Sequence, residues 1–265
     1  MKKLLLLITG LLLLFSVEGQ ILRYSNYVAP IPSTGGGEST LWDGLTAVFD
    51  LQETAVPIVD EIASLTSTGT VGSTAINYSQ TGVNGNCMNF NYLPSYGFGQ
   101  RIIVGNDLLL HGTLSVSLWF YVNDSGNDTY GMVHNNNGGS QNRGYFLFTG
   151  GVGGGVAARA YNSSGAYVEI DSAPGWTVPS ANTWYNYIFV ADGTNLSIYI
   201  NGTLRAQDSF PYSIDYGSDS VLIIGGRDAA NGWCFSGRLD EIYFYNRALT
   251  STEITNLQTQ FYPFN

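Results

Sequence analysis

Residues 235–250 read FSGRLDEIYFYNRALT and carry the clearest signal of the fold class in the sequence. Its aromatic and aliphatic content predicts a strand from Phe235 to Tyr245. Because side chains alternate between the two faces of a strand, Asp240 should share a face with Ile242 and Phe244. A carboxylate among apolar side chains is costly unless it is paired or bound to a metal ion.

A short helix should follow this strand. Thr250 and Glu253 have the spacing of a capping box, and Ile254 and Leu257 provide an apolar stripe behind it. No other segment gives a convincing helix.

Upstream of this stretch the sequence predicts a hairpin. Residues 184–191 form one strand, and residues 196–200, which alternate apolar with polar side chains, form the next. Asn201-Gly202 is the strongest short hairpin signal, so residues 203–208 should return as a further strand.

Short strands recur along the rest of the chain. Residues 114–122 should form a strand with two different faces. Its apolar face has Leu114, Val116, Leu118, Phe120 and Val122, and its other face has Ser115, Ser117, Trp119 and Tyr121. Further strands are expected at 46–51, 88–92, 101–104, 145–148, 156–161 and 221–225. This pattern predicts an all-β fold, a two-sheet antiparallel jelly-roll sandwich with one short C-terminal helix.

The composition fits an extracellular β domain. The chain of 265 residues is 44% hydrophobic, which allows a large core, but only 11% charged. Lys2, Lys3, the apolar run from Leu4 to Phe15 and Val17-Glu18-Gly19 are typical of a bacterial-looking secretory signal cleaved before Gln20. That run is too short to span a bilayer, and we expect no membrane span after it.

We therefore expect three parts in the chain. Residues 1–19 are a signal peptide, residues 20–41 a flexible N-terminal arm or linker, and residues 42–265 one domain. Pro30, Pro32 and the segment Ser33-Thr-Gly-Gly-Gly37 give the arm its linker character.

The charge balance excludes several classes of function. Removing residues 1–19 leaves eight basic and nineteen acidic residues, a formal charge of −11, and all the basic residues are then arginines. Such a chain repels a phosphate backbone, so nucleic acid is not an expected partner. Without lysine, Schiff-base chemistry and a P-loop are also excluded.

The quoted stretch resembles the C-terminal signature of laminin-G-like, concanavalin A-like jelly rolls. Further matches to that family are Trp184-Tyr185-x-Tyr187, the hairpin over 192–202, Phe49-x-Leu51-x-Glu53 and Val59-Asp60. The resemblance extends from about Trp42 to Leu257. It implies the jelly-roll fold and a domain that binds glycans, cell-surface ligands or neighbouring domains.

The resemblance also implies a structural calcium ion, with Asp60 and Asp240 as the side-chain ligands. Carboxylates in loops are hard oxygen ligands, which suit Ca²⁺. The alternative is that Arg238, two residues from Asp240 and on the same face, neutralises it.

The carboxylates do not have the spacing expected of a glycosidase. Asp60-Glu61 and Asp240-Glu241 are adjacent pairs, so in a strand the two members point to opposite faces. His134 lies in an Asn- and Gly-rich segment that we expect to be a solvated loop. We therefore expect a protein without catalytic residues.

Three loops, at 94–100, 123–143 and 228–233, combine aromatics with Asn, Asp or Gln. Their candidate ligand-binding residues are Tyr96, Phe98, Tyr130 and Trp233. Sugar recognition needs an aromatic plane for C–H groups and polar groups for hydroxyls. The alternative is that these aromatics fold back onto the sandwich as lids.

Cys87 and Cys234 are the only cysteines. In an exported protein such a pair is first interpreted as a disulfide, and the alternative is two buried free thiols.

Together these observations favour a secreted or surface-displayed, non-enzymatic binding module of carbohydrate-binding or adhesin type, stabilised by calcium. Its partner would be a glycan or an extracellular protein. The alternative is a structural subunit of an extracellular fibre, appendage or virion. In that case residues 20–40 would self-assemble with a neighbouring subunit's sheet edge.

Overall fold

The structure is a computed structural model, and every residue it describes belongs to the compact unit Gly37–Asn265. The described residues are 41–55, 57–62, 65, 67, 69–71, 76–93, 98–105, 108, 110–123, 130–137, 143–150, 154–178, 181–216, 220–227 and 233–263. The expected signal peptide (1–19) and arm (20–40) lie outside the described residues.

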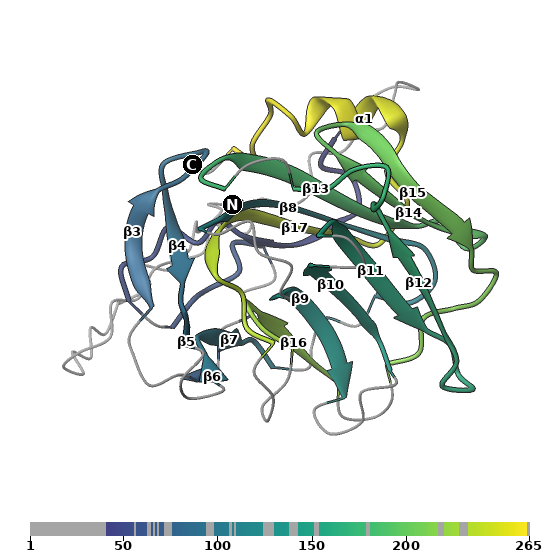
Figure 1. Ribbon diagram of the computed structural model, residues 1–265, viewed down its shortest axis with the longest axis horizontal. Helices are drawn as coiled ribbons and strands as arrows, with labels where there is room; N and C mark the ends of the chain where they lie inside the picture. The colour runs from purple at the N-terminus through teal and green to yellow at the C-terminus, as the bar shows by residue number, and fades with distance from the viewer. Residues whose placement is uncertain are drawn as a thin grey trace, which may run out of the picture. The chain divides into compact units, whose positions relative to one another are not determined.

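Eight strands form the first antiparallel sheet (Figure 1). Its order is β15–β14–β13–β8–β17–β4–β3, and β1 pairs with β17 beside this path. The strands are β1 (Leu45–Phe49), β3 (Asn77–Thr81), β4 (Asn86–Phe90), β8 (Leu114–Val122), β13 (Trp184–Ala191), β14 (Asn195–Ile200), β15 (Thr203–Ser209) and β17 (Gly237–Tyr245). The aromatic-rich segment after Phe235 thus forms β17, an interior strand paired with β8 and β4.

Seven strands form the second sheet, in the order β12–β11–β10–β9–β16–β7–β2. They are β2 (Gly69–Val71), β7 (Arg101–Ile103), β9 (Tyr130–Asn137), β10 (Tyr145–Thr149), β11 (Val156–Tyr161), β12 (Tyr167–Asp171) and β16 (Ser220–Ile224), and a separate short pair joins β5 (Tyr92–Leu93) to β6 (Phe98–Gly99). The expectation of a loop over 123–143 was wrong for β9, which lies between β10 and β16. His134 in that strand is buried and not solvated.

The main core lies between the two sheets. The predicted alternation in β8 is confirmed, because Leu114, Val116, Leu118, Phe120 and Val122 all belong to this core. Tyr145, Leu147, Val156, Ala158 and Ala160 of the second sheet belong to the same cluster. The predicted antiparallel two-sheet sandwich is therefore confirmed.

A smaller apolar cluster covers the outer face of the first sheet. Ile254 and Leu257, at α1 (Ser251–Asn256), pack with Ile188, Tyr243 and Tyr245, which point away from the main core. Figure 1 shows α1 on the side of the first sheet that faces away from the second. Among the described residues, no helix is long and apolar enough to cross a membrane.

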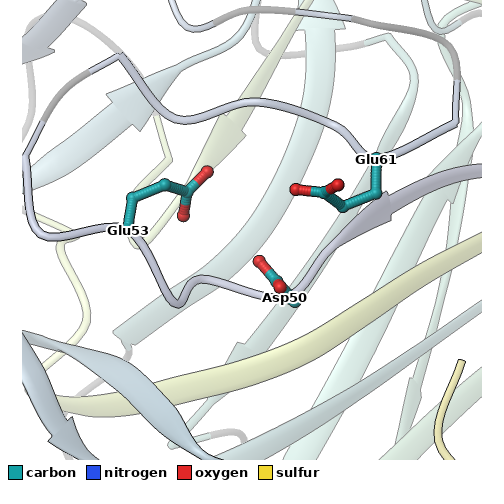
Figure 2. Close-up of side chains that lie close together, drawn as sticks. All are labelled: Asp50, Glu53 and Glu61. Carbon is teal, nitrogen blue, oxygen red and sulfur yellow. The ribbon is translucent and has the colours of Figure 1, made fainter. Parts of the chain in front are cut away.

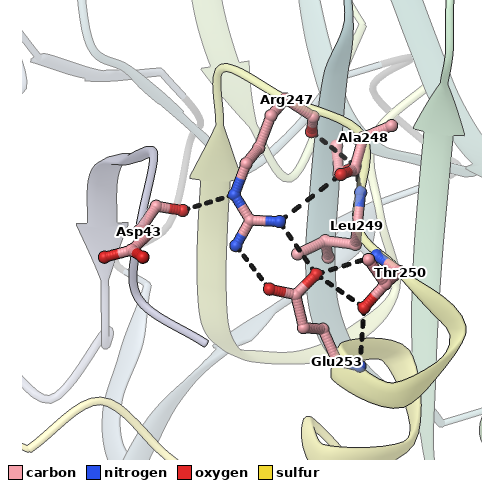
Figure 3. Close-up of polar contacts among 7 residues, drawn as sticks. Asp43, Arg247, Ala248, Leu249, Thr250 and Glu253 are labelled. Carbon is pink, nitrogen blue, oxygen red and sulfur yellow. Dashed lines mark hydrogen bonds and ion pairs between the residues drawn. The ribbon is translucent and has the colours of Figure 1, made fainter. Parts of the chain in front are cut away.

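The predicted capping box at the start of α1 is present and extends to an arginine (Figure 3). The Glu253 N–H donates to Thr250 Oγ1 at 3.3 Å, and the Thr250 N–H donates to Glu253 Oε2 at 2.8 Å. Arg247 donates to both Glu253 oxygens, at 2.8 and 2.7 Å, and its Nε donates to the Asp43 carbonyl at 2.6 Å. This network ties the helix to the chain before β1.

The predicted hairpin turn joins β14 to β15. Asn201 and Gly202 have φ angles of 48° and 74°, the left-handed values that a two-residue turn of type I′ needs.

A β-bulge in β17 overturns the predicted orientation of Asp240. Asp240 pairs with Trp119 and Tyr243 with Ser117, so β17 has one extra residue between these positions, and Glu241 has a φ of 50°. Leu239, Ile242 and Phe244 face the core. Asp240 therefore points to the outer face and not to the face of Ile242 and Phe244.

Candidate functional site

An aromatic cluster lies on the outer face of the second sheet. Phe146 and Phe148 alternate along β10 with the core residues Tyr145 and Leu147, so their rings point away from the core. The two rings stack with centroids 4.6 Å apart. Phe146, Phe148, Ala157 and Trp233 form what we call the aromatic cluster.

An arginine and a histidine border this cluster. The Arg227 guanidinium carbon lies 4.3 Å from the centroid of the Trp233 ring, a cation–π distance. The His134 ring lies 4.9 Å from that of Phe146, and its Nδ1 contacts the Arg227 carbonyl. Phe146, Phe148, His134 and Arg227 are buried, so among these side chains only the partly buried Trp233 ring is open to a ligand.

Trp233 is the one predicted ligand residue whose side chain is described. Its ring is partly buried and lies 6.1 Å from the Phe146 ring, as the lid alternative predicts. Tyr96 lies outside the described residues, and only the backbone is described for Phe98 and Tyr130.

The backbone nevertheless brings three predicted positions together. The Gly131 N–H, next to Tyr130, donates to the Trp233 carbonyl at 3.0 Å. A Cβ added at Gly99, next to Phe98, would lie 2.2 Å from the Cys234 Cβ. The chain at Phe98, Tyr130 and Trp233 therefore converges, although these residues are far apart in sequence.

A second group continues the same face across β11 and β12. Arg159 pairs with Glu169 in register, and its Nε donates to Glu169 Oε2 at 2.8 Å. Arg159 Nη1 donates to the Tyr161 hydroxyl at 3.3 Å, and the guanidinium carbon lies 4.6 Å from the Tyr167 ring centroid. We call Arg159, Tyr161, Tyr167 and Glu169 the tyrosine–arginine group.

Sequence reasoning missed this second group. Its members stand on two strands with no unusual loop to draw attention to them. Only the register of the β11–β12 hairpin places Arg159 opposite Glu169 and Tyr161 opposite Tyr167. The sequence pattern that could have predicted the group is an aromatic and a charged residue two positions apart in each strand, which places both on the same face.

A carboxylate cluster lies in the segment that follows β1. Asp50, Glu53 and Glu61 each offer an oxygen, and these atoms lie within 4.8 Å of one another. Figure 2 shows the three carboxylates pointing toward a common centre. Glu53 Oε1 accepts the Val59 N–H at 2.8 Å, whereas its Oε2 is buried with no hydrogen-bond partner in the described part of the chain.

The environment of this cluster disfavours negative charge. Burial raises the pKa of Glu53 to about 7, and repulsion from Asp50 and Glu61 adds to the effect, although the Val59 N–H opposes it. Burial also raises the pKa of Asp50. A divalent cation would relieve this repulsion, and an all-oxygen donor set suits Ca²⁺. The residues therefore fit a calcium site.

The two predicted calcium ligands have backbone partners. Asp60 is buried, and its Oδ1 accepts the N–H groups of Val48 and Ile62. Asp240 Oδ2 accepts the Val83 N–H at 2.7 Å. The structure does not bring Asp60 and Asp240 into the carboxylate cluster.

Arg238 does not form the predicted ion pair with Asp240 within the described residues. Its Nη1 donates to the Thr81 carbonyl at 3.1 Å, and its guanidinium carbon lies 4.7 Å from the Tyr121 ring centroid. Asp240 is fully buried, and its Oδ1 has no hydrogen-bond partner in the part of the chain that is described.

The predicted disulfide between Cys87 and Cys234 is absent, and both residues are buried free thiols. Cys87 alternates in β4 with the core residue Met88, and its thiol lies close enough to Asp240 and Arg238 for their charges to affect it. Cys234 lies beside the second sheet, where its backbone pairs with that of Gly131 as an isolated parallel β-bridge. The two thiols therefore occupy separate environments, as the free-thiol alternative expects.

Several solved structures share this fold. Domain 4 of AbnA, an extracellular arabinanase from Geobacillus stearothermophilus solved with arabinotriose, matches with a TM-score of 0.63 and 20% identity, over 81% of this chain and 98% of that domain. The binding domain of Paraclostridial Mosquitocidal Protein 1 gives 0.62 and 19%, over 83% of this chain and 52% of that one. The botulinum neurotoxin serotype D ligand-binding domain with N-acetylneuraminic acid gives 0.58 and 14%, over 82% and 50%.

The chain thus spans about half the length of the toxin domains. At these identities the likeness is one of fold. No curated protein sequence matches the chain. The sequence model of a laminin-G family, described as the Concanavalin A-like lectin/glucanases superfamily, matches residues 97–255. Because that match covers more than half of the sequence, the chain belongs to this superfamily.

Proposed function

We propose that this protein is a secreted or surface-displayed, non-enzymatic carbohydrate-binding module. The observation that carries the proposal is the outer face of the second sheet, where the partly buried Trp233 ring lies beside Arg227 and the exposed Tyr167 ring lies beside Arg159. Aromatic planes next to hydrogen-bonding groups are what sugar rings and their hydroxyls need.

The comparisons support carbohydrate as the class of ligand. One structural neighbour was solved with arabinotriose and another with N-acetylneuraminic acid, and the toxin neighbours are binding domains. The family match supports the same class of function.

A structural calcium ion is part of the proposal. Asp50, Glu53 and Glu61 are the side chains that would hold it, because their oxygens lie within 4.8 Å of one another. Glu61 is exposed, which leaves the cluster accessible from solvent. When bound, the ion would neutralise the three carboxylates and hold together the segment that contains them.

The proposal is tested by screening residues 20–265 on an array of neutral and acidic glycans. Trp233→Ala should weaken binding to every glycan retained by the parent protein. The matched control is Trp119→Ala, which truncates a half-buried tryptophan on the first sheet, and it should bind as the parent does. Failure of the folded parent protein to retain any glycan would overturn the proposal.

A second candidate function is a structural subunit. β15 is an edge strand in which six of the seven residues are exposed, so it offers a sheet edge for strand addition. Residues 20–40 of a second copy are the proposed donor. Deleting them should convert an assembly to a monomer, and a parent protein that is already monomeric would exclude this candidate.

A further inference from the structure

We propose that the outer face of β9–β12 binds an uncharged glycan chain laid across the strands, with Tyr167 as stacking platform and the Arg159–Glu169 pair as the partner of its hydroxyls. This inference rests on the proposed function and specifies its ligand class.

Tyr167 has the properties of a preformed platform. Its side chain is 54% exposed, yet Arg159 contacts its ring and the Tyr161 ring lies 5.3 Å away. The ring is therefore fixed by its neighbours while more than half of its surface faces water. A ring held in this way can stack on the C–H face of a sugar with little loss of conformational entropy.

The Arg159–Glu169 pair has hydrogen-bonding capacity left over. Both described Arg159–Glu169 contacts use Glu169 Oε2, which leaves Oε1 as an acceptor without a partner among the described residues. The two side chains are 21% and 27% exposed. A sugar hydroxyl can therefore donate to Glu169 while a neighbouring hydroxyl accepts from the guanidinium.

The charges on this face are balanced, which favours a neutral ligand. Arg159 is paired with Glu169, and Arg143 with Asp215, which also lies beside this face. Arg227, beside Trp233, and Asp171, opposite Ala157, add one charge of each sign. An acidic sugar would have to break such a pair and approach a chain with a formal charge of −10. An uncharged sugar meets neither cost.

The groups span several strands. Tyr167 is on β12, and the partly buried Trp233 is hydrogen-bonded to Gly131 on β9, three strands away in a sheet whose strands β9 to β12 lie side by side in Figure 1. Three strand spacings amount to about 14 Å, which exceeds the length of one sugar ring. The face therefore suits an oligosaccharide better than a monosaccharide.

The test measures binding of residues 20–265 to two sets of probes by calorimetry and on an array. The neutral set contains lactose, arabinotriose and gluco- and manno-oligosaccharides of increasing length, and the acidic set contains 3′-sialyllactose and oligogalacturonate. Neutral chains should bind, with affinity that rises with length. Tyr167→Ala should weaken binding by about tenfold or more, and Glu169→Gln should weaken it to a smaller extent.

Leu204→Ala is the matched control, since it truncates a 46% exposed side chain on the first sheet, and it should bind as the parent does. Leu204→Ala should keep the parent melting temperature, and Tyr167→Ala should remain folded with a small decrease, because only Tyr167 loses contacts with an arginine and a second aromatic ring. Preferential binding of the acidic probes, or neutral binding unchanged in Tyr167→Ala, would overturn this inference and leave the proposed function standing. Failure of both probe sets to bind the folded protein would overturn both.

Discussion

The carboxylate of Asp240 accepts a hydrogen bond from the backbone N–H of Val83 at 2.7 Å, although the two residues are 157 positions apart in sequence. The turn between β3 and β4 is thereby attached to β17. A Cβ at Gly82 would lie 2.3 Å from the same carboxylate oxygen, so the close approach requires glycine there. The bulge at Glu241 makes the contact possible because it turns Asp240 out of the core.

The Asp240→Asn variant should change how stability depends on pH. Burial raises the pKa of Asp240 to about 8, and the neighbouring Glu241 adds to the shift, while the N–H groups of Val83 and Asn84 oppose it. In an unfolded chain an Asp has a pKa of about 3.9, so the folded protein binds the extra proton. The free energy of unfolding of the parent protein should therefore fall as pH rises from 4 to 8. The Asp240 carboxyl should contribute at most about 1.4 kcal/mol per pH unit to this fall.

Urea unfolding at pH 5 and pH 8 in the presence of a chelator measures this effect. Asp240→Asn should lose less stability between the two pH values than the parent protein. Part of the dependence should remain, because burial also raises the pKa of Glu53 and that of Glu241 to about 7. Equal pH dependence in both proteins would show that Asp240 is already ionised.

The Glu253→Gln variant should be destabilised, with the opposite pH dependence. Burial alone would raise the pKa of Glu253, but hydrogen bonds from Arg247 and Thr250 outweigh it and lower the pKa. The stabilisation is therefore present above the unfolded pKa and is lost as pH falls through the folded one. At pH 7 the variant should lose about 1–3 kcal/mol, because Arg247 loses a charged bidentate partner, whereas glutamine can keep the capping box.

Ser251→Ala in the same helix is the control, and it should change the free energy of unfolding by no more than about 0.5 kcal/mol. The difference between Glu253→Gln and the parent protein should shrink at pH 3. A difference that is the same at both pH values would assign the effect to packing and not to charge.

Local patterns in the sequence predicted many elements of the fold but missed β2, β3, β9 and β12. Alternation predicted which side chains of β8 face the core, and Asn201-Gly202 and Thr250–Glu253 predicted a turn and a helix start from chemistry within a few residues. The bulge in β17 was not predictable in this way. No Gly or Pro marks Glu241, and the bulge is defined only by pairing with β8.

The candidate site was less predictable than the fold. Trp233 stood out because its loop is unusual, whereas Phe146, Phe148 and Tyr167 look like ordinary strand residues until the sheet order is known. The carboxylate cluster was missed for a related reason. Asp60 was predicted from the family resemblance, but its oxygens accept backbone N–H groups, and the three carboxylates that converge are those of Asp50, Glu53 and Glu61.

The two cysteines should be free and unreactive in the native protein. Both are fully buried, and burial raises the pKa of Cys87 to about 12, so its reactive thiolate is scarce at neutral pH. Iodoacetamide should add no mass to the native protein and two carbamidomethyl groups after unfolding without a reductant. Non-reducing peptide mapping that links Cys87 to Cys234 would restore the disulfide prediction.

Calcium should raise the melting temperature of chelator-treated protein at pH 8, and Glu53→Gln should remove the increase. At a hundredfold excess over the dissociation constant, binding stabilises the folded state by about 2.7 kcal/mol. The increase should shrink as pH falls from 8 to 5, because the pKa of Glu53 is about 7 and protons then compete with the ion. Asp240→Asn, which alters a carboxylate bonded to the backbone, is the matched control and should keep the increase. If the calcium-induced increase in melting temperature survives Glu53→Gln but disappears in Asp240→Asn, the site is the predicted Asp60–Asp240 pair. If calcium does not change the melting curve of the parent protein at pH 8, the ion is removed from the proposal.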